Sequence, residues 1–161
     1  MRAEGHEVGN HSHTHADLGT EPWRAAEELE RASGAIALAL GRRPALFRPP
    51  LGAWTSDVLA EARRKGMRTV LWDVNPHDYA GGGRAAAEIA DDVLRAARRG
   101  SIVLLHDGGE AEHRGPLLET LPALVEGLRA RFELVTVPRL LGEEVEPAPA
   151  GLDRGAEQPV D

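Results

Sequence analysis

Short apolar runs alternate with stretches of helical spacing through most of this 161-residue sequence. The runs have the length of strands. The fourth carries four consecutive apolar residues, as expected of a strand covered on both faces. The five strands are predicted over 6–11, 44–50, 68–74, 101–107 and 132–137. This alternation predicts an α/β fold with a parallel sheet, either open or closed into a barrel.

Helices are predicted over 21–40, 56–65 and 84–99, and a last helix runs to about residue 131. Thr20 is placed to cap the first helix, and Gly41 supplies the left-handed residue that ends it. Pro122 either kinks the last helix or restarts it at a first-turn position. The residues expected to face the core from the first and third helices are Trp23, Leu29, Ala32, Ile36, Leu40, Ile89, Val93 and Ala96.

The segment 142–161 differs from the rest of the chain. It is acidic, rich in proline and glycine, and without periodicity, so we predict a disordered tail. The remaining residues, 1–141, are enough for one domain with a hydrophobic core.

Composition excludes several classes of function. The net charge of −7 is spread without long runs of one sign, and no basic stripe indicates a nucleic-acid or membrane-surface partner. The sequence has no cysteine, which excludes disulfides, thiolate metal ligands and a cysteine nucleophile. No apolar stretch is long enough to span a bilayer, and the first residues do not have the pattern of a signal peptide.

Three of the seven histidines fall within five positions, in the sequence GNHSHTHADL. Imidazoles four residues apart share one face of a helical turn, so His11 and His15 are predicted to bind one metal ion. His13 points elsewhere in that geometry. The alternative is a solvated polar loop, because histidine-rich tracts alone are weak indicators of a metal site.

Two further polar groups follow predicted strands. In FRPPLG (47–52), two prolines stiffen the loop and so fix Arg48, although a tight turn with a solvated arginine has the same sequence. In WDVNPHDY (72–79), a turn begun by Asn-Pro accounts for Asn75 and Pro76 without function. It does not account for Asp78 and Tyr79.

The fourth group lies where the most apolar strand ends, in LLHDGG (104–109). A histidine before a glycine loop at the carboxyl end of a parallel strand is a candidate acid or base, so His106 is selected. A purely structural histidine is the alternative.

In chain order the motifs are His-Ser-x-x-His (11–15), Arg-Pro-Pro-x-Gly (48–52), Asn-x-x-Asp-aromatic (75–79) and Leu-x-His (104–106). This series resembles the polysaccharide deacetylases, the NodB-homology domain of carbohydrate esterase family 4, over about residues 5–137. The resemblance implies that 1–141 is a distorted (β/α) barrel. It also implies a metal-dependent enzyme that removes acetyl groups from an N-acetylated polysaccharide or oligosaccharide, of peptidoglycan or chitin type.

The resemblance assigns roles around a divalent metal, usually zinc, with cobalt and nickel as alternatives. His11 and His15 become metal ligands, and the backbone N–H of Leu51 helps to stabilise the oxyanion. Arg48 is expected to pair with Asp78 and so orient the catalytic carboxylate.

The same resemblance makes His106 the general acid that protonates the leaving amine, and Leu104 a wall of the acetyl-methyl pocket. Leu51 stands where the family often has an aromatic residue, and Tyr79 where it usually has tryptophan. Both, together with Trp72, are expected to line the sugar groove.

One family motif, Thr/Ser-Phe-Asp-Asp-Gly-Pro, does not occur in this sequence. Its two aspartates serve as general base and third metal ligand, so both are expected to be missing, and the sheet to have an open edge. Asp17 and Asp107 could substitute as ligands, but neither follows from the motif. The expectation is that Met1 is an internal methionine of a longer bacterial deacetylase. It would be exported to the envelope or secreted if an upstream signal exists, and cytoplasmic otherwise.

Two other functions stay open. A non-catalytic sugar- or metal-binding remnant of a deacetylase predicts the same fold and partial site without hydrolysis. A histidine-rich metal-handling protein of unrelated fold requires the other three motifs to be accidental.

Overall fold

The computed structural model of the chain describes residues 4–79, 85–107 and 111–142, with side chains described in these ranges except at 111–116. Its elements are the 3-10 turns η2 (Pro22–Arg24) and η3 (Pro50–Gly52), the strands β1 (Leu46–Phe47) and β2 (Arg68–Thr69), and the helices α1 (Ala25–Leu40), α2 (Ser56–Arg64), α3 (Ala86–Ala96), α4 (Ala111–Arg129) and α5 (Val137–Leu140). None of the helices described in these ranges is both long and apolar enough to cross a membrane.

The strand segments pair in parallel, as predicted, and they follow one another in sequence order. β1 pairs with β2, and isolated parallel bridges join Asn10 to Phe47 and Val74 to Val103. The segment 68–74 therefore takes part in both ladders, one at each end. Helices lie between consecutive strand segments, which is the connection that parallel pairing requires.

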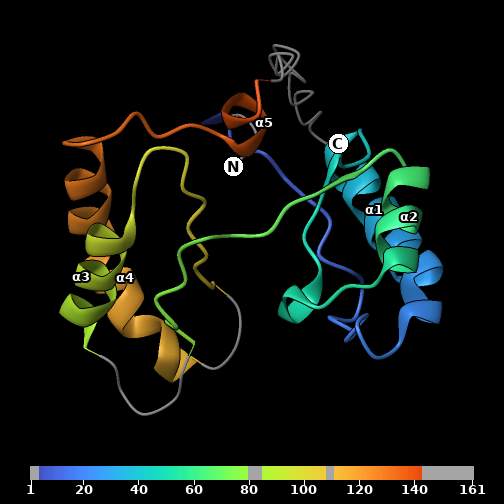
Figure 1. Ribbon diagram of the computed structural model, residues 1–161, viewed down its shortest axis with the longest axis horizontal. Coiled ribbons are helices and arrows are strands. Elements are labelled where there is room, and N and C mark those ends of the chain that lie inside the picture. The colour runs from blue at the N-terminus through green and yellow to red at the C-terminus, as the bar shows by residue number, and fades with distance from the viewer. Residues whose placement is uncertain (1–3, 80–84, 108–110, 143–161) are drawn as a thin grey trace, which may run out of the picture.

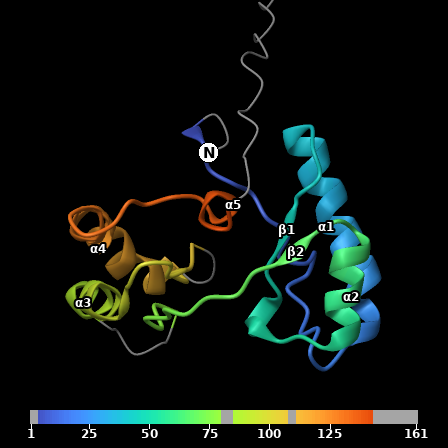
Figure 2. The ribbon, with the colours of Figure 1, turned by 45° about the horizontal axis from the view of Figure 1, so that its top comes forward.

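The helices form two groups, each with its own core (Figure 1). α1 and α2 lie side by side next to β1 and β2 (Figure 2), and the first core lies among them. α3 packs against α4 over the second core. The first core consists of Ala16, Leu18, Ala25, Leu29, Phe47, Val58, Ala62 and Met67. The second core consists of Val74, Ala90, Val93 and Leu124, with Leu94, Val103, Leu105 and Leu128 partly buried against it.

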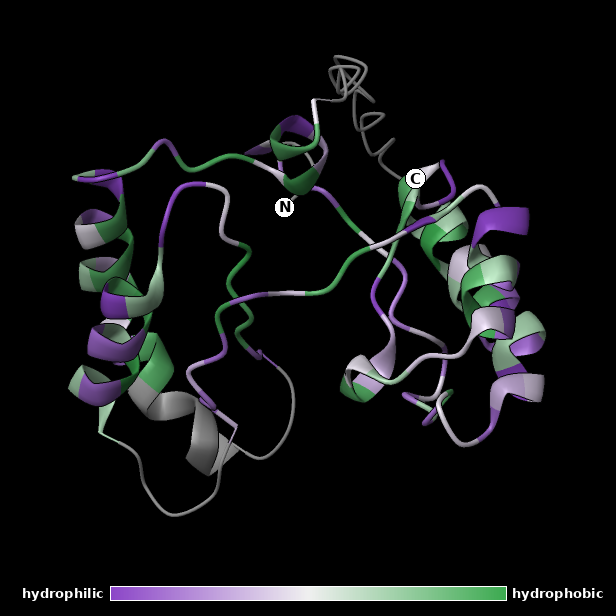
Figure 3. Cartoon of the chain, viewed as in Figure 1, coloured by the Kyte–Doolittle hydropathy of each residue, from purple (hydrophilic) through white to green (hydrophobic). Residues whose placement is uncertain are grey.

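The predicted strands are shorter than expected, and one of them does not form: the segment 6–11 contributes only the bridge at Asn10, and β1 and β2 have two residues each. The segment 101–107 forms a single bridge, and of its four apolar residues only Leu104 is buried, so the prediction of cover on both faces is wrong. The segment 132–137 forms no strand: Leu134 and Val135 are exposed, and α5 begins at Val137. A strand needs backbone partners as well as a suitable sequence. In Figure 3 the helices carry hydrophobic and hydrophilic residues next to each other, as expected of helices with one face on a core.

The first helix begins later than predicted. Thr20 does not cap it; its hydroxyl instead donates to the Asp17 carbonyl oxygen at 3.3 Å, and α1 starts at Ala25 after η2. Trp23 belongs to η2 and is 73% exposed, so its assignment to the core is wrong. Leu29 and Ala32 are buried as predicted, Ile36 and Leu40 are half-buried, and Gly41 ends the helix with a φ of 74°.

The later helices differ in detail. α3 ends at Ala96, which is exposed, and Ala97 is buried in its place, while Ile89 and Val93 are buried as predicted. α4 runs without interruption through Pro122, so the restart at that residue is wrong. All of the predicted tail after residue 142 lies outside the described residues.

Candidate active site

The histidine loop, residues 11–15, brings two of its imidazoles together. The ring centroids of His11 and His15 are 5.0 Å apart, and the rings are inclined at 75°. The expected helical turn is absent. Instead, Ser12 and His15 have φ values of 61° and 59°, in the left-handed region that non-glycine residues seldom adopt. The sequence thus predicted that the His11 and His15 rings lie together, but it predicted a helical turn where the backbone has left-handed residues.

His11 is held as a neutral imidazole. Its Nδ1 donates to the Arg48 carbonyl oxygen at 2.7 Å, which leaves the Nε2 lone pair for a metal ion. Burial lowers the pKa of His11, against the hydrogen bond to Arg48, which raises it. The positive charges of His15, Arg48 and His106 lower this pKa further. His106 therefore lies in the same electrostatic environment as the histidine loop.

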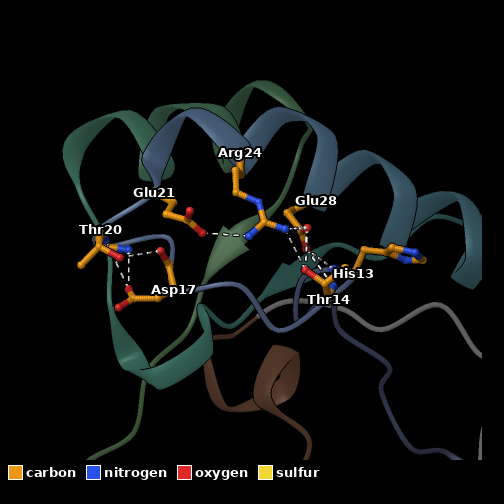
Figure 4. Close-up of polar contacts among 8 residues, drawn as sticks. His13, Thr14, Asp17, Thr20, Glu21, Arg24 and Glu28 are labelled. Carbon is orange, nitrogen blue, oxygen red and sulfur yellow. Dashed lines mark hydrogen bonds and ion pairs between the residues drawn. The ribbon is translucent and has the colours of Figure 1, made fainter.

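The carboxylate of Glu28, on α1, points toward His13 and Thr14 of the histidine loop (Figure 4). It accepts hydrogen bonds from the backbone N–H groups of His13 and Thr14 and from the Thr14 hydroxyl, and it pairs with Arg24. Burial alone would raise the pKa of Glu28, but these contacts outweigh it and lower the pKa to about 2. Sequence reasoning missed this residue; the only signal was an acid in the first turn of the helix that follows the loop.

Asn10 is a second buried anchor that the sequence analysis missed. Its side-chain oxygen accepts the Ser12 N–H at 2.9 Å, and its Nδ2 donates to the Leu29 carbonyl oxygen and the Ser33 hydroxyl, both at 2.9 Å. The start of the histidine loop is therefore tied to the inner face of α1.

The loop after β1 rests on Trp72. The Arg48 guanidinium lies 5.8 Å from the centre of that ring, and a Cβ atom at Gly52 would come within 2.8 Å of its Cη2. Gly52 also has a φ of 67°. Glycine is therefore required at position 52 for two reasons, the contact with the ring and the positive φ. Leu51, at a φ of 58°, is exposed.

Arg48 does not pair with Asp78, and that prediction is wrong. Half-burial of its guanidinium over Trp72 lowers the pKa of Arg48. Trp72 itself thus supports the loop. It also lines a cavity of about 320 Å³ with residues of β2 and Leu141, and no residue of the histidine loop lines that cavity.

Asp78 holds His106 instead. Its side chain is 2% exposed; Oδ1 lies 2.9 Å from His106 Nδ1, and Oδ2 accepts the His106 backbone N–H at 2.7 Å. Because a carboxylate accepts at Nδ1, that nitrogen carries the proton and Nε2 is the atom left for chemistry. The Tyr79 ring packs edge-on against His106, with centroids 4.8 Å apart. Leu104 is buried two residues earlier.

No group of three or more metal-ligating side chains is found among the described residues. Asp17, one of the two suggested substitutes, accepts the N–H groups of Gly19 and Thr20 and so shapes the turn before η2. Asp107 is exposed and has an interaction of its own. The structure thus brings two candidate ligands together, without a third among the described side chains.

The comparisons with known proteins identify the family of this chain. Residues 1–70 match the family model for polysaccharide deacetylases. A chitooligosaccharide deacetylase from Bradyrhizobium sp. (strain ANU 289) is 42% identical over an alignment of 152 positions, and the alignment covers 87% of this chain and 68% of the relative. This chain therefore belongs to the polysaccharide deacetylase family.

Solved structures show the same fold. The peptidoglycan deacetylase PdaC from Bacillus subtilis is 30% identical with a TM-score of 0.72, over 86% of this chain and 65% of that one. A mutant CE4-family pseudoenzyme from Bacillus anthracis with restored enzymatic activity is 26% identical with a TM-score of 0.72, over 84% and 47%. The predicted (β/α) barrel fold of the deacetylase type is confirmed. The chain spans about two thirds of the first of these solved chains and less than half of the second.

Proposed function

We propose that this chain takes part in the hydrolytic removal of acetyl groups from an N-acetylated sugar polymer of chitin or peptidoglycan type. One observation carries the proposal: two of the motifs form side-chain pairs, with the His11 and His15 rings 5.0 Å apart and with Asp78 bound to both the ring and the backbone N–H of His106. Hydrolysis of an acetamide needs a group that polarises the carbonyl and a group that protonates the leaving nitrogen. The two pairs supply candidates for both within one site.

His106 is proposed as the general acid. Asp78 fixes its Nδ1–H tautomer and stabilises the imidazolium, so Nε2 can deliver a proton to the sugar nitrogen as the carbon–nitrogen bond breaks. The sugar then leaves as a neutral amine instead of an amide anion. Acetate and the deacetylated sugar are the products.

His11 and His15 fit a divalent metal ion, because the neutral His11 imidazole presents Nε2 and the two rings are adjacent. Zinc is proposed, with cobalt and nickel as substitutes. Such an ion would supply Lewis-acid polarisation of the acetyl carbonyl. Protein zinc sites normally use at least three protein ligands, so the two histidines need an additional ligand for tight binding.

The remaining predicted residues have supporting roles in this proposal. The Leu51 backbone N–H is proposed as a donor to the oxyanion, and the half-buried Arg48 as a nearby positive charge. Leu104 would contact the acetyl methyl group. Tyr79 is exposed beside His106, where an aromatic ring can pack against the apolar face of a sugar.

A non-catalytic sugar- or metal-binding role is the second candidate. It is favoured by the hydrogen bonds that two described carboxylates already make: Asp78 binds His106, and Asp17 accepts a backbone N–H in a turn. Neither is placed to take a proton from an attacking water.

Acetate release from N-acetylated chitooligosaccharides, with added zinc or cobalt, separates the two candidates. We expect little or no release by the 161-residue chain, because a general base is typically worth about 10²–10⁴ in rate. A version extended at its N-terminus by a segment carrying Phe-Asp-Asp-Gly-Pro should release acetate, and His106→Ala should abolish it. An inactive extended version that still binds the sugar would favour the non-catalytic role. Release by the short chain would show that another carboxylate acts as base, with Asp107→Asn as the first test.

A further inference from the structure

The backbone of the histidine loop is strained at both ends. Ser12 and His15 both have left-handed φ values, a region that is strained for a residue with a side chain. Such strain persists only where the surroundings fix the backbone. The two residues between them, His13 and Thr14, are the ones whose N–H groups bind Glu28.

Glu28 differs from its neighbours on α1. Its side chain is 5% exposed, whereas the side chains of Glu27 and Glu30 are 73% and 52% exposed and form ion pairs at the surface. A buried carboxylate is retained only when hydrogen bonds and charge compensate its desolvation. The histidine loop and Arg24 supply that compensation here.

The hydrogen-bond pattern requires a carboxylate. Oε2 accepts the N–H groups of His13 and Thr14, at 2.9 and 2.8 Å, while Oε1 accepts the Thr14 hydroxyl at 2.7 Å and Arg24 Nη2 at 2.9 Å. All four partners donate, on both oxygens. A glutamine side chain has one oxygen and one NH₂ group, so it would leave a donor facing donors.

We propose that Glu28 is a positioning residue for the metal-binding histidines: its carboxylate fixes the strained backbone between them and so holds the His11 and His15 rings side by side. The proposal rests on the proposed function of that pair. Glu28 lies on a different element from the loop and contacts the backbone rather than either imidazole. It therefore acts through the loop and needs no contact with substrate or ion.

The test is Glu28→Gln in the full chain, with two readouts. The first is the nuclear Overhauser contact between the ring protons of His11 and His15 without metal, and the second is zinc affinity by calorimetric titration. We expect the ring contact to be lost and the zinc Kd to rise about 10-fold, the lower range for losing a group that orients a metal ligand. Thr14→Val, which removes only the hydroxyl contact, should change both readouts in the same direction by less.

Two control variants separate positioning from general destabilisation. Glu27→Gln changes the adjacent exposed glutamate and should leave both readouts unchanged. Val58→Ala, in the first core, should lower the melting temperature but retain the ring contact and the zinc affinity.

The proposal is overturned if Glu28→Gln retains both readouts, or if Val58→Ala changes them as much. Should Glu28→Gln not fold, Thr14→Val decides: unchanged ring contact and affinity would overturn the proposal. If the wild-type chain binds no zinc, the proposed metal function fails, and the ring contact alone then decides the role of Glu28.

Discussion

The two groups of helices hold their halves of the site in different ways. In the first, α1 and α2 lie side by side next to β1 and β2 (Figure 2), and Phe47, Leu18 and Leu29 are fully buried in one core. In the second, α3 and α4 cover the segments around Val74 and Val103, and half of the core residues are only partly buried. The histidine loop belongs to the first group and the Asp78–His106 pair to the second. The two parts of the candidate site therefore lie on cores that differ in burial: the first core consists of buried residues, and the second is half partly buried.

The largest expected effect is on the first core. Phe47→Ala removes a fully buried ring between the helices and the paired strands, and we expect it to lower the free energy of unfolding by about 3–5 kcal/mol. Leu124→Ala, in the second core, should cost about 2–3 kcal/mol, because its partly exposed surroundings can relax into the space. Urea denaturation followed by circular dichroism measures both. A larger loss for Leu124→Ala would reverse the comparison.

The second prediction concerns acid. The pKa of Glu28 is lowered to about 2, so its ionised form stabilises the folded state above the ordinary carboxyl value of 4.5. That stability, on the order of 2–3 kcal/mol, is lost as the pH falls from about 5 towards 2. The difference in the free energy of unfolding between wild type and Glu28→Gln should therefore be largest at pH 7 and smaller at pH 3.

Asp73 is the residue of the second group whose pH dependence can be compared with that of Glu28. Burial alone would raise the pKa of Asp73, but hydrogen bonds from the Ile102 N–H and the Ser101 hydroxyl outweigh it, and the Arg98 charge lowers this pKa further. Its side chain is about one third exposed, so solvent weakens these contacts and Asp73→Asn should show the same trend with a smaller difference. Melting curves at pH 7, 5 and 3 compare the two variants. A difference for Glu28→Gln that does not change with pH would contradict the assignment.

The third prediction tests the contact of the loop after β1 with Trp72, a residue between the two ladders. Gly52→Ala requires a strained φ and places a Cβ atom against the ring, so we expect a loss of about 1–3 kcal/mol. Gly34→Ala is the control, because a Cβ atom there would meet nothing within 4 Å, and helix propensity favours alanine inside α1. Equal melting temperatures for the two variants would show that the ring moves aside.

The sequence was most informative where a motif is local. His11, His15 and His106 lie in short loops that follow strand segments, and the order of the motifs was enough to select them and to predict the family fold. The end of the first helix was equally local, because Gly41 requires no knowledge of any other segment.

Properties that depend on a distant partner could not be predicted. The family resemblance assigned Arg48 and Asp78 to each other, but which carboxylate reaches which cation depends on the path of the backbone. Glu28 resembled two exposed glutamates on the same helix, and only the fold separates them. The segment 132–137 has a strand-like sequence, yet α5 begins within it.

The smallest expected effect is that of zinc on the 161-residue chain. With His11 and His15 as the only predicted ligands, the ion lacks an anionic ligand, and the dissociation constant should be no tighter than roughly 100 µM. At about 100 µM free zinc such a site stabilises the fold by about 0.4 kcal/mol, a rise in melting temperature of about 1–2 °C. His11→Ala should remove this rise, whereas His13→Ala should retain it, because His13 contributes its backbone N–H to Glu28 and lies outside the ring pair. Calorimetric titration provides the direct comparison. A tight 1:1 complex that His11→Ala abolishes would mean that a further side chain completes the site, and Asp107→Asn would then show whether that residue is the third ligand.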